Sequence, residues 1–143
     1  MIFSKELLFS DDQAITATAI SENVVNLQLP GTPFGAGAPL HQDIGKGNKI
    51  PISILVTEAF DNLTSLEIAI ETGATDTLGT AILSQTILLA DLTVGKSTVF
   101  DVLPNELTEQ YLGLRYTVTG TAPTVGKVNA GITMGNQTNF TGA

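Results

Sequence analysis

The 143-residue sequence has no cysteine, no tryptophan, a single histidine and a small share of charged residues. Without cysteine, the chain forms neither disulfides nor thiolate metal sites. The single histidine, His41, stands among glycines and prolines without a partner at metal-ligand spacing. Nucleophilic catalysis needs a base beside the nucleophile, and the sequence offers no evident one. We therefore expect that the protein is not an enzyme and that it has no cofactor and no metal site.

Basic residues are scarce as well, with six Lys and Arg against 14 Asp and Glu, for a formal net charge of −8. The six are dispersed, whereas phosphate backbones and anionic membrane surfaces are bound by clustered Lys and Arg. No apolar run approaches the ~20 residues of a membrane helix. Residues 1–13, interrupted by Lys5 and Glu6, do not read as a secretion signal. We expect neither a nucleic-acid partner nor a membrane partner.

What the sequence does contain is the alternation of apolar and polar residues that is typical of β-strands. It is clearest over residues 111–119, where β-branched and aromatic residues follow a period of two. A second alternating run occupies residues 127–134, after a loop with Gly120, Pro123 and Gly126. Two such runs joined by a Gly- and Pro-containing loop predict an antiparallel hairpin. The residues predicted to share one face are Leu112, Leu114, Tyr116 and Val118 in the first run, and Val128, Ala130, Ile132 and Met134 in the second.

Shorter runs of the same kind predict six more strands. The first two suit a hairpin, and Ser10, Asp11 and Asp12 before them read as a turn. Residues 104–110 suit a single helical turn, and no segment keeps the 3.6-residue apolar period of a longer helix. About eight short strands at regular spacing predict one antiparallel all-β domain over residues 1–143, a sandwich or a barrel. The six further strands are predicted at residues 14–20, 24–29, 50–57, 65–72, 81–89 and 97–103.

Three segments have too little periodic apolar pattern to belong to the core of that domain. They are a flexible N-terminal arm at residues 1–9, a loop at residues 30–49 with five glycines and three prolines, and a tail at residues 135–143. Long loops of this kind tend to be functional or mobile, and segments that order on a partner can wrap a large surface. Aromatic side chains buried in a partner's pocket carry much of an interface's energy. The candidate contact residues are Phe3, Leu7, Phe34 and Phe140.

Two acidic residues and one arginine are predicted to lie on the outer faces of strands. Glu67 and Glu71 alternate outward on one strand. A pair of carboxylates can hydrolyse glycosides, but two residues at this spacing more often form a solvated face. Arg115, on the polar face of its strand, is expected to form a cross-strand ion pair with an outward Glu, with a partner's carboxylate as the alternative.

A series of segments, taken in order, resembles one protein family. The segments are LLFSDDQAITATAISENVVNL (7–27), DIGKG (43–47), ILVTEAFDNLTSLEIAIET (54–72), ILLADLTVGKS (87–97) and QYLGLRYTVTGTAPTVGKVNAGI (110–132). Together they resemble the small capsid cement, or decoration, proteins of tailed bacteriophages of the podophage type, and the last segment is the most specific. The stretch between Leu29 and Asp43 is longer than the family leads us to expect.

The resemblance implies a jelly-roll-like fold and a place on the outer surface of an icosahedral phage head, after synthesis in the host cytoplasm. A protein of this kind clamps neighbouring subunits of the major capsid protein and stabilises the shell. Phe3, Leu7, Phe34 and Phe140 are then the candidate capsid contacts. We also expect a homodimer on a local two-fold axis, because two-fold dimers are the commonest closed assembly, with a trimer as the alternative.

Two other functions fit a chain rich in β-strands. The first is a carbohydrate-binding module on a β-sandwich, a kind of protein that usually stacks sugars on exposed aromatic side chains. Against it, tryptophan is absent, and Tyr111 and Tyr116 are predicted to lie on opposite faces of one strand. The second is a hydrolase, which ranks last for want of a base. Fold alone does not decide among these functions.

Overall fold

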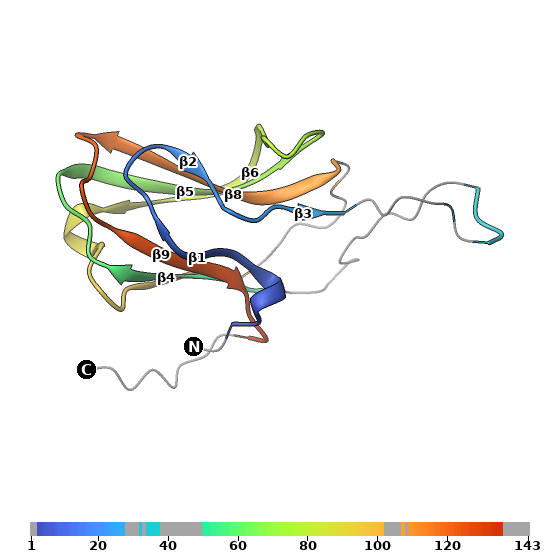
Figure 1. Cartoon of the computed structure of the whole chain (residues 1–143), viewed down its shortest axis with the longest axis horizontal. Coiled ribbons are helices and arrows are strands. Elements are labelled where there is room, and N and C mark those ends of the chain that lie inside the picture. The colour runs from blue at the N-terminus through green and yellow to red at the C-terminus, as the bar shows by residue number, and fades with distance from the viewer. Residues whose placement is uncertain are drawn as a thin grey trace.

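The computed structural model describes residues 3–27, 32, 34–37, 50–101, 107 and 109–135. Over these residues the chain forms nine β-strands in two antiparallel sheets, which Figure 1 shows as two layers. The helical elements in the same residues are two 3-10 turns of three residues each, as the lack of a helical period predicts. The elements are η1 (Lys5–Leu7), β1 (Leu8–Ala14), β2 (Ala19–Ile20), β3 (Val25–Asn26), β4 (Ile52–Glu58), β5 (Leu63–Gly73), β6 (Thr80–Leu88), η2 (Leu89–Asp91), β7 (Ser97–Phe100), β8 (Tyr111–Gly120) and β9 (Lys127–Ile132).

The strand order is that of a jelly roll. One sheet has the order β1-β9-β4-β7 and the other has the order β2-β8-β5-β6, with β3 also paired to β8. Because β2 and β3 both pair with β8, they act as one interrupted strand. The pairs β1–β9, β2/β3–β8, β4–β7 and β5–β6 then describe a single long hairpin rolled into two sheets. The expectation of an all-β, jelly-roll-like sandwich of about eight antiparallel strands is confirmed.

The predicted final hairpin is wrong, although both of its strands exist. Strand β8 pairs with β5 in one sheet, while β9 pairs with β1 and β4 in the other. The loop at residues 121–126 therefore crosses from one layer to the other, as Figure 1 shows for the two orange-red strands. A Gly- and Pro-containing loop suits either connection, so the sequence pattern does not distinguish them.

The start of the chain also differs from the prediction. Ser10, Asp11 and Asp12, predicted as a turn, lie inside β1, where two register shifts against β9 make bulges. Asp12 adopts a φ of 53°, which explains why residues with turn propensity fit there. Leu8 and Phe9, from the predicted arm, belong to the same strand, and Phe9 is buried.

The predicted hairpin between residues 14–20 and 24–29 is wrong as well. In the described part of these two runs, which ends at residue 27, the residues in strands are Ala14, Ala19 and Ile20 of the first run and 25–26 of the second. The short strands β2 and β3 pair with β8 and not with each other. In a jelly roll, this part of the chain runs along a single partner strand, here β8. Because β8 is far away in the sequence, local strand propensity does not reveal this pairing.

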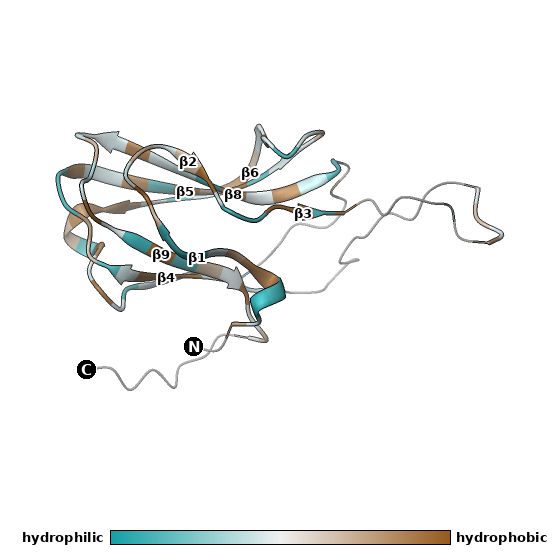
Figure 2. Cartoon of the chain, in the orientation of Figure 1, coloured by the Kyte–Doolittle hydropathy of each residue, from teal (hydrophilic) through white to brown (hydrophobic). Residues whose placement is uncertain are grey.

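The inner faces of the two sheets bury one apolar core. On β8, Leu112, Leu114 and Tyr116 are at most 2% exposed, which confirms the predicted face. Figure 2 shows the corresponding alternation of brown and teal bands along the strands. Met134 is the exception, because β9 ends at Ile132 and the Met134 side chain is exposed. Within the described ranges, no helix has the length and hydropathy needed to cross a membrane.

A buried hydrogen-bonded group joins the two sheets through the core. The hydroxyl groups of Tyr116 on β8 and Ser10 on β1 lie 2.8 Å apart and share a hydrogen bond. Ser10 Oγ donates to Gln13 Oε1 at 2.6 Å, and Gln13 Nε2 donates to the carbonyl of Ile20. A buried tyrosine needs such a partner for its hydroxyl. Burial raises the pKa of the Tyr116 phenol above its usual range, so the group stays protonated and can donate.

Candidate interaction surface

Several strand ends meet at one end of the sandwich. The start of β1, the end of β9 and the start of β4 are neighbours in one sheet. The backbone N–H of Thr133, just after β9, donates to the carbonyl of Pro51, just before β4 (3.0 Å). On the facing sheet, Asn23 donates its backbone N–H to the carbonyl of Phe9 in β1 (2.9 Å), which brings β3 to the same end. Figure 1 shows the arrowhead of β9 beside η1 in the lower layer, with β3 in the layer above.

This end of the sandwich is where the chain enters and leaves the three predicted contact segments. We call it the arm end and define it by Leu7, Leu27, Ile50 and Met134, which lie at the borders of those segments. Met134 is 98% exposed and Leu7 is 40% exposed, whereas Leu27 is buried. Exposed apolar side chains that lie together at one end of a domain are typical of an interaction surface. The arrangement was not predictable from the sequence, because it depends on the order of strands in the sheet.

The predicted contact residues differ in how they are placed. Phe3 is half-buried, close to η1, and Leu7 lies at the arm end. Phe34 is fully exposed, so its side chain does not fill the end of the β core. Phe140 lies outside the described residues, as do His41 and most of the loop at residues 30–49, the tail and the predicted helical turn. Met134 was missed as a surface residue because the period-two pattern placed it in a strand.

At the other end of the sandwich, the Asp61 carboxylate holds two loops together. It accepts hydrogen bonds from the backbone N–H and the hydroxyl of Thr124, and from the N–H of Val125 at 3.3 Å. Asp61 lies between β4 and β5, and its partners lie in the loop that joins β8 to β9. The hydrogen bond from the Thr124 side chain lowers the pKa of Asp61, with backbone N–H groups adding to it.

A second carboxylate fixes the bulge of β1. Asp12 accepts hydrogen bonds from the hydroxyl of Thr57 (2.7 Å) and from Lys127 Nζ (2.9 Å), while its backbone N–H donates to Asn129 Oδ1. The bond from Thr57 and then the one from Lys127 lower the pKa of Asp12. The hydrogen bond to Asp12 in turn raises the pKa of Lys127. These contacts join β1, β9 and β4 on the outside of one sheet, where they have a structural role.

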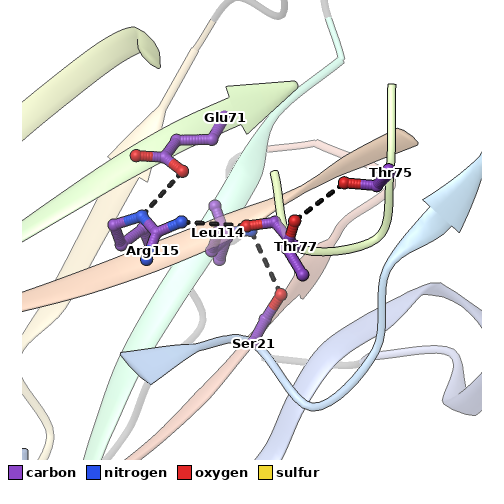
Figure 3. A network of polar contacts seen from close by, with 6 residues as sticks. All are labelled: Ser21, Glu71, Thr75, Thr77, Leu114 and Arg115. Atoms are coloured by element: carbon purple, nitrogen blue, oxygen red, sulfur yellow. Dashed lines mark hydrogen bonds and ion pairs between the residues drawn. The ribbon is translucent and has the colours of Figure 1, made fainter. Parts of the chain in front are cut away.

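Glu71 is not on a solvated face, which corrects the prediction. Its carboxylate accepts a hydrogen bond from Arg115 Nε at 2.7 Å, and the Glu71 side chain is only 9% exposed (Figure 3). The loop at residues 74–79 covers the pair, and Arg115 Nη2 donates to the carbonyl of Thr77 (3.0 Å). The expected cross-strand ion pair of Arg115 is confirmed. Glu67, four residues earlier on the same strand, is partly exposed, so the two side chains lie in different environments.

The loop at residues 74–79 also packs closely over a glycine of β8, Gly113. A Cβ on Gly113 would lie 2.9 Å from Leu78 Cδ1 and 3.2 Å from Ser21 Oγ. Leu78 is buried with a φ of 60°, and Ser21 Oγ accepts a hydrogen bond from the backbone N–H of Leu114, as Figure 3 shows. Leu78 of the loop and Ser21, just after β2, therefore pack over Gly113 of β8 on the outer face of the sheet.

The polar groups described so far are used for structure. Every buried side-chain nitrogen and oxygen atom of the described residues has a hydrogen-bond partner. In that same part of the chain, no group of three or more His, Cys, Asp or Glu side chains is placed to hold a metal ion. Of the exposed large apolar side chains in the described residues, Leu7 and Met134 lie at the arm end, and Phe34 lies in the predicted contact loop. The others are Leu83, Leu88, Val94 and Val125.

A known protein family matches most of the chain. The model of the Bbp16 family matches residues 9–132. The chain belongs to the Bbp16 family. Bbp16 is a phage-associated family, which agrees with the resemblance of the sequence to phage proteins. No curated protein matches the chain.

The part matched to Bbp16 coincides with the jelly roll. It begins at the buried Phe9 of β1 and ends at Ile132, the last residue of β9. Phe3, Leu7, Met134 and Phe140 lie outside the matched residues, and Phe34 lies inside them. The Bbp16 match therefore describes the sandwich, and the exposed residues of the arm end flank it.

Proposed function

We propose that this Bbp16 protein is a capsid cement protein, which binds the outer surface of an icosahedral phage head and clamps neighbouring subunits of the major capsid protein. The observation that carries the proposal is the arm end of a jelly roll from a phage-associated family. There, exposed Leu7 and Met134 lie beside the segments at the two ends of the chain. A jelly roll with exposed apolar side chains at one end suits a protein that ties two capsid subunits together.

The chemistry of the surface supports a structural role without catalysis. Charged residues make up 14% of the chain, and the net charge is −8, which suits a position outside the shell and away from packaged DNA. Many copies on a symmetric shell act together, so modest contacts for each copy suffice. Carbohydrate binding has less support, because Tyr116 is completely buried and cannot stack on a sugar.

The proposal is tested by adding purified protein to phage heads that were assembled without it. Phe34→Ala should weaken binding to these heads by ~1–3 kcal/mol per copy, because an aromatic anchor carries much of an interface's energy. Its melting temperature should stay unchanged, since Phe34 is fully exposed. Phe3→Ala is the companion variant. Because the Phe3 side chain is half-buried, the melting temperature of this variant is measured as well, to show whether the substitution affects folding.

Val94→Ala is the matched control. Val94 is an exposed apolar residue, but it precedes β7 at the end of the sandwich opposite to the arm end. It should bind heads like the unmodified protein. If the unmodified protein does not bind the heads, the cement function fails. If Phe34→Ala binds with full affinity, the function stands and Phe34 is not an anchor.

A further inference from the structure

The edge strand beside β8 is interrupted. Strands β2 and β3 have two residues each, both pair with β8, and residues 21–24 between them are in no strand. So short a ladder has few hydrogen bonds with which to resist local opening. Nevertheless, Val25 packs against the core and Leu27, just after β3, is buried. Contacts other than the ladder must therefore hold this edge on β8.

Ser21 supplies part of these contacts at the interruption. It is buried, and its backbone N–H donates to the carbonyl of Leu114 on β8 at 2.8 Å. Its hydroxyl oxygen accepts a hydrogen bond from the Leu114 N–H at 3.1 Å and donates to the carbonyl of Asn23 at 2.8 Å. Asn23 in turn donates its N–H to the carbonyl of Phe9 on β1 at 2.9 Å. The interruption is thus held by a strand of each sheet.

The loop at residues 74–79 covers the same interruption from outside. Around the place where Gly113 has no Cβ lie Leu78 Cδ1, Ser21 Oγ and Val24 Cγ2, at 2.9, 3.2 and 3.5 Å from the position of that missing atom. The side chain of Leu78 therefore shares one small space with two residues of the interruption. Leu78 has a φ of 60°, which is strained for a branched residue and persists only where the surrounding structure determines it.

Other contacts fix this loop over the sheet. Gly73 of β5 leaves room for its backbone, because a Cβ there would lie 2.7 Å from the Cα of Leu78. Arg115 Nη2 donates to the carbonyl of Thr77 at 3.0 Å, and the hydroxyls of Thr75 and Thr77 share a hydrogen bond at 2.7 Å (Figure 3). Within the loop, the N–H of Leu78 donates to the carbonyl of Thr75 at 3.1 Å.

We propose that the loop at residues 74–79 is a latch that holds β3 on β8, and that the loop and β3 open together as one unit. Without Leu78 above Gly113, water reaches Ser21 from outside and competes for its hydrogen bonds to Leu114. Local opening in proteins commonly involves contiguous units of this size. The latch goes beyond the cement function and does not depend on it. It would fix the side of the arm end at which Leu27 donates its N–H to the carbonyl of Gln110 (2.7 Å).

Amide hydrogen exchange of the full chain, followed residue by residue, tests the latch. Leu78→Ala removes the covering side chain and keeps the backbone requirement, so it isolates the contact. It should speed exchange of the Ser21 and Leu27 amides about tenfold or more. The amide of Val56, which donates to the carbonyl of Lys96 in the other sheet, should change by less than about twofold. Leu78→Met conserves side-chain volume and should keep most of the protection.

Leu83→Ala is the matched control, because Leu83 is an exposed leucine on β6, a few residues after the same loop. It should leave the exchange of all these amides unchanged. Faster exchange confined to the loop and residues 21–27 supports the latch. If only the Leu78 amide exchanges faster, the loop opens independently of β3 and the proposal fails. It fails equally if Val56 speeds up as much as Ser21, because Leu78 would then stabilise the whole fold and not this edge.

Discussion

At the scale of single residues, Gly126 shows a position where any side chain is excluded. A Cβ on this residue would lie 2.3 Å from Cδ1 of Phe60, closer than real contacts allow, and its φ of +136° strains other residues. The Phe60 ring is buried under the crossing between the two sheets, next to the loop that Asp61 holds. The turn that links β8 to β9 is therefore fitted to Phe60.

Gly126→Ala should lower the free energy of unfolding by about 2–4 kcal/mol, because overpacking and a strained backbone add together. Urea denaturation measures the change. Gly37→Ala is the matched control, since nothing lies within 4 Å of a Cβ there and its φ is not in the left-handed region. The control should change the unfolding free energy by less than about 0.5 kcal/mol. An equal loss in both variants would contradict the role of Phe60.

At the scale of elements, the loop at residues 74–79 turns an outer sheet face into a buried one. It covers Glu71 and Arg115, and Leu78 packs over Gly113. A charge that is buried without its partner is costly, whereas a paired one is roughly neutral. The ion pair is therefore expected to matter most when only one of its members is removed.

Arg115→Met should cost about 1–3 kcal/mol of stability, because it leaves the Glu71 carboxylate unpaired under the loop. Adding Glu71→Gln should recover part of that loss, and chemical denaturation of the two single variants and the double variant gives the coupling. Lys96→Met is the control, because Lys96 and Asp91 are exposed and 3.8 Å apart. Such a surface pair contributes less than about 1 kcal/mol. Full additivity of the two substitutions would rule out the buried pair.

The element scale also shows what the sequence pattern could and could not predict. The period of two in residues 111–119 correctly predicted a strand and its buried face, because that period follows from the backbone alone. The partners of the strand were not predictable, since β8 and β9 pair with strands far away in the sequence. The bulge at Asp12 was mistaken for a turn because both use the same residues. The covered Glu71 was missed because nothing in residues 65–72 shows that residues 74–79 fold back over them.

The same limits apply to the candidate interaction surface. The lack of periodicity around Phe34 and Leu7 predicts them as contact residues, and both side chains are exposed. Met134 followed a period that continues past the end of β9, so only the structure reveals its exposure. The gathering of these segments at the arm end depends on which strands are neighbours. That is a property of the jelly roll, and no local pattern contains it.

The stability of the whole molecule should have a broad plateau with losses at both pH extremes. Asp12 and Asp61 have pKa values below the usual 3.8, so their contribution is present above about pH 4 and is lost as the pH falls through their folded-state values. Lys127 has a pKa above 10.5, so its contribution is present below that pH and is lost as the pH rises past it. The buried Tyr116 phenol adds to the alkaline loss, because the unfolded chain ionises above pH 10.0 while the folded chain resists ionisation.

The acid loss can be assigned by mutation, because both carboxylates act through identified partners. In a variant with both Asp12→Asn and Asp61→Asn, stability near neutral pH should be lower, and its dependence on pH below about 4 should be shallower. The midpoint of urea unfolding between pH 2 and 11 measures both effects. Tyr116→Phe should likewise flatten the dependence above pH 10, at the expense of the hydrogen bond to Ser10. An acid dependence that keeps its slope in the double variant would show that other carboxylates control it. The loop clamp at Asp61 and the bulge at Asp12 would then be supports of the native geometry that contribute little to the pH dependence of folding.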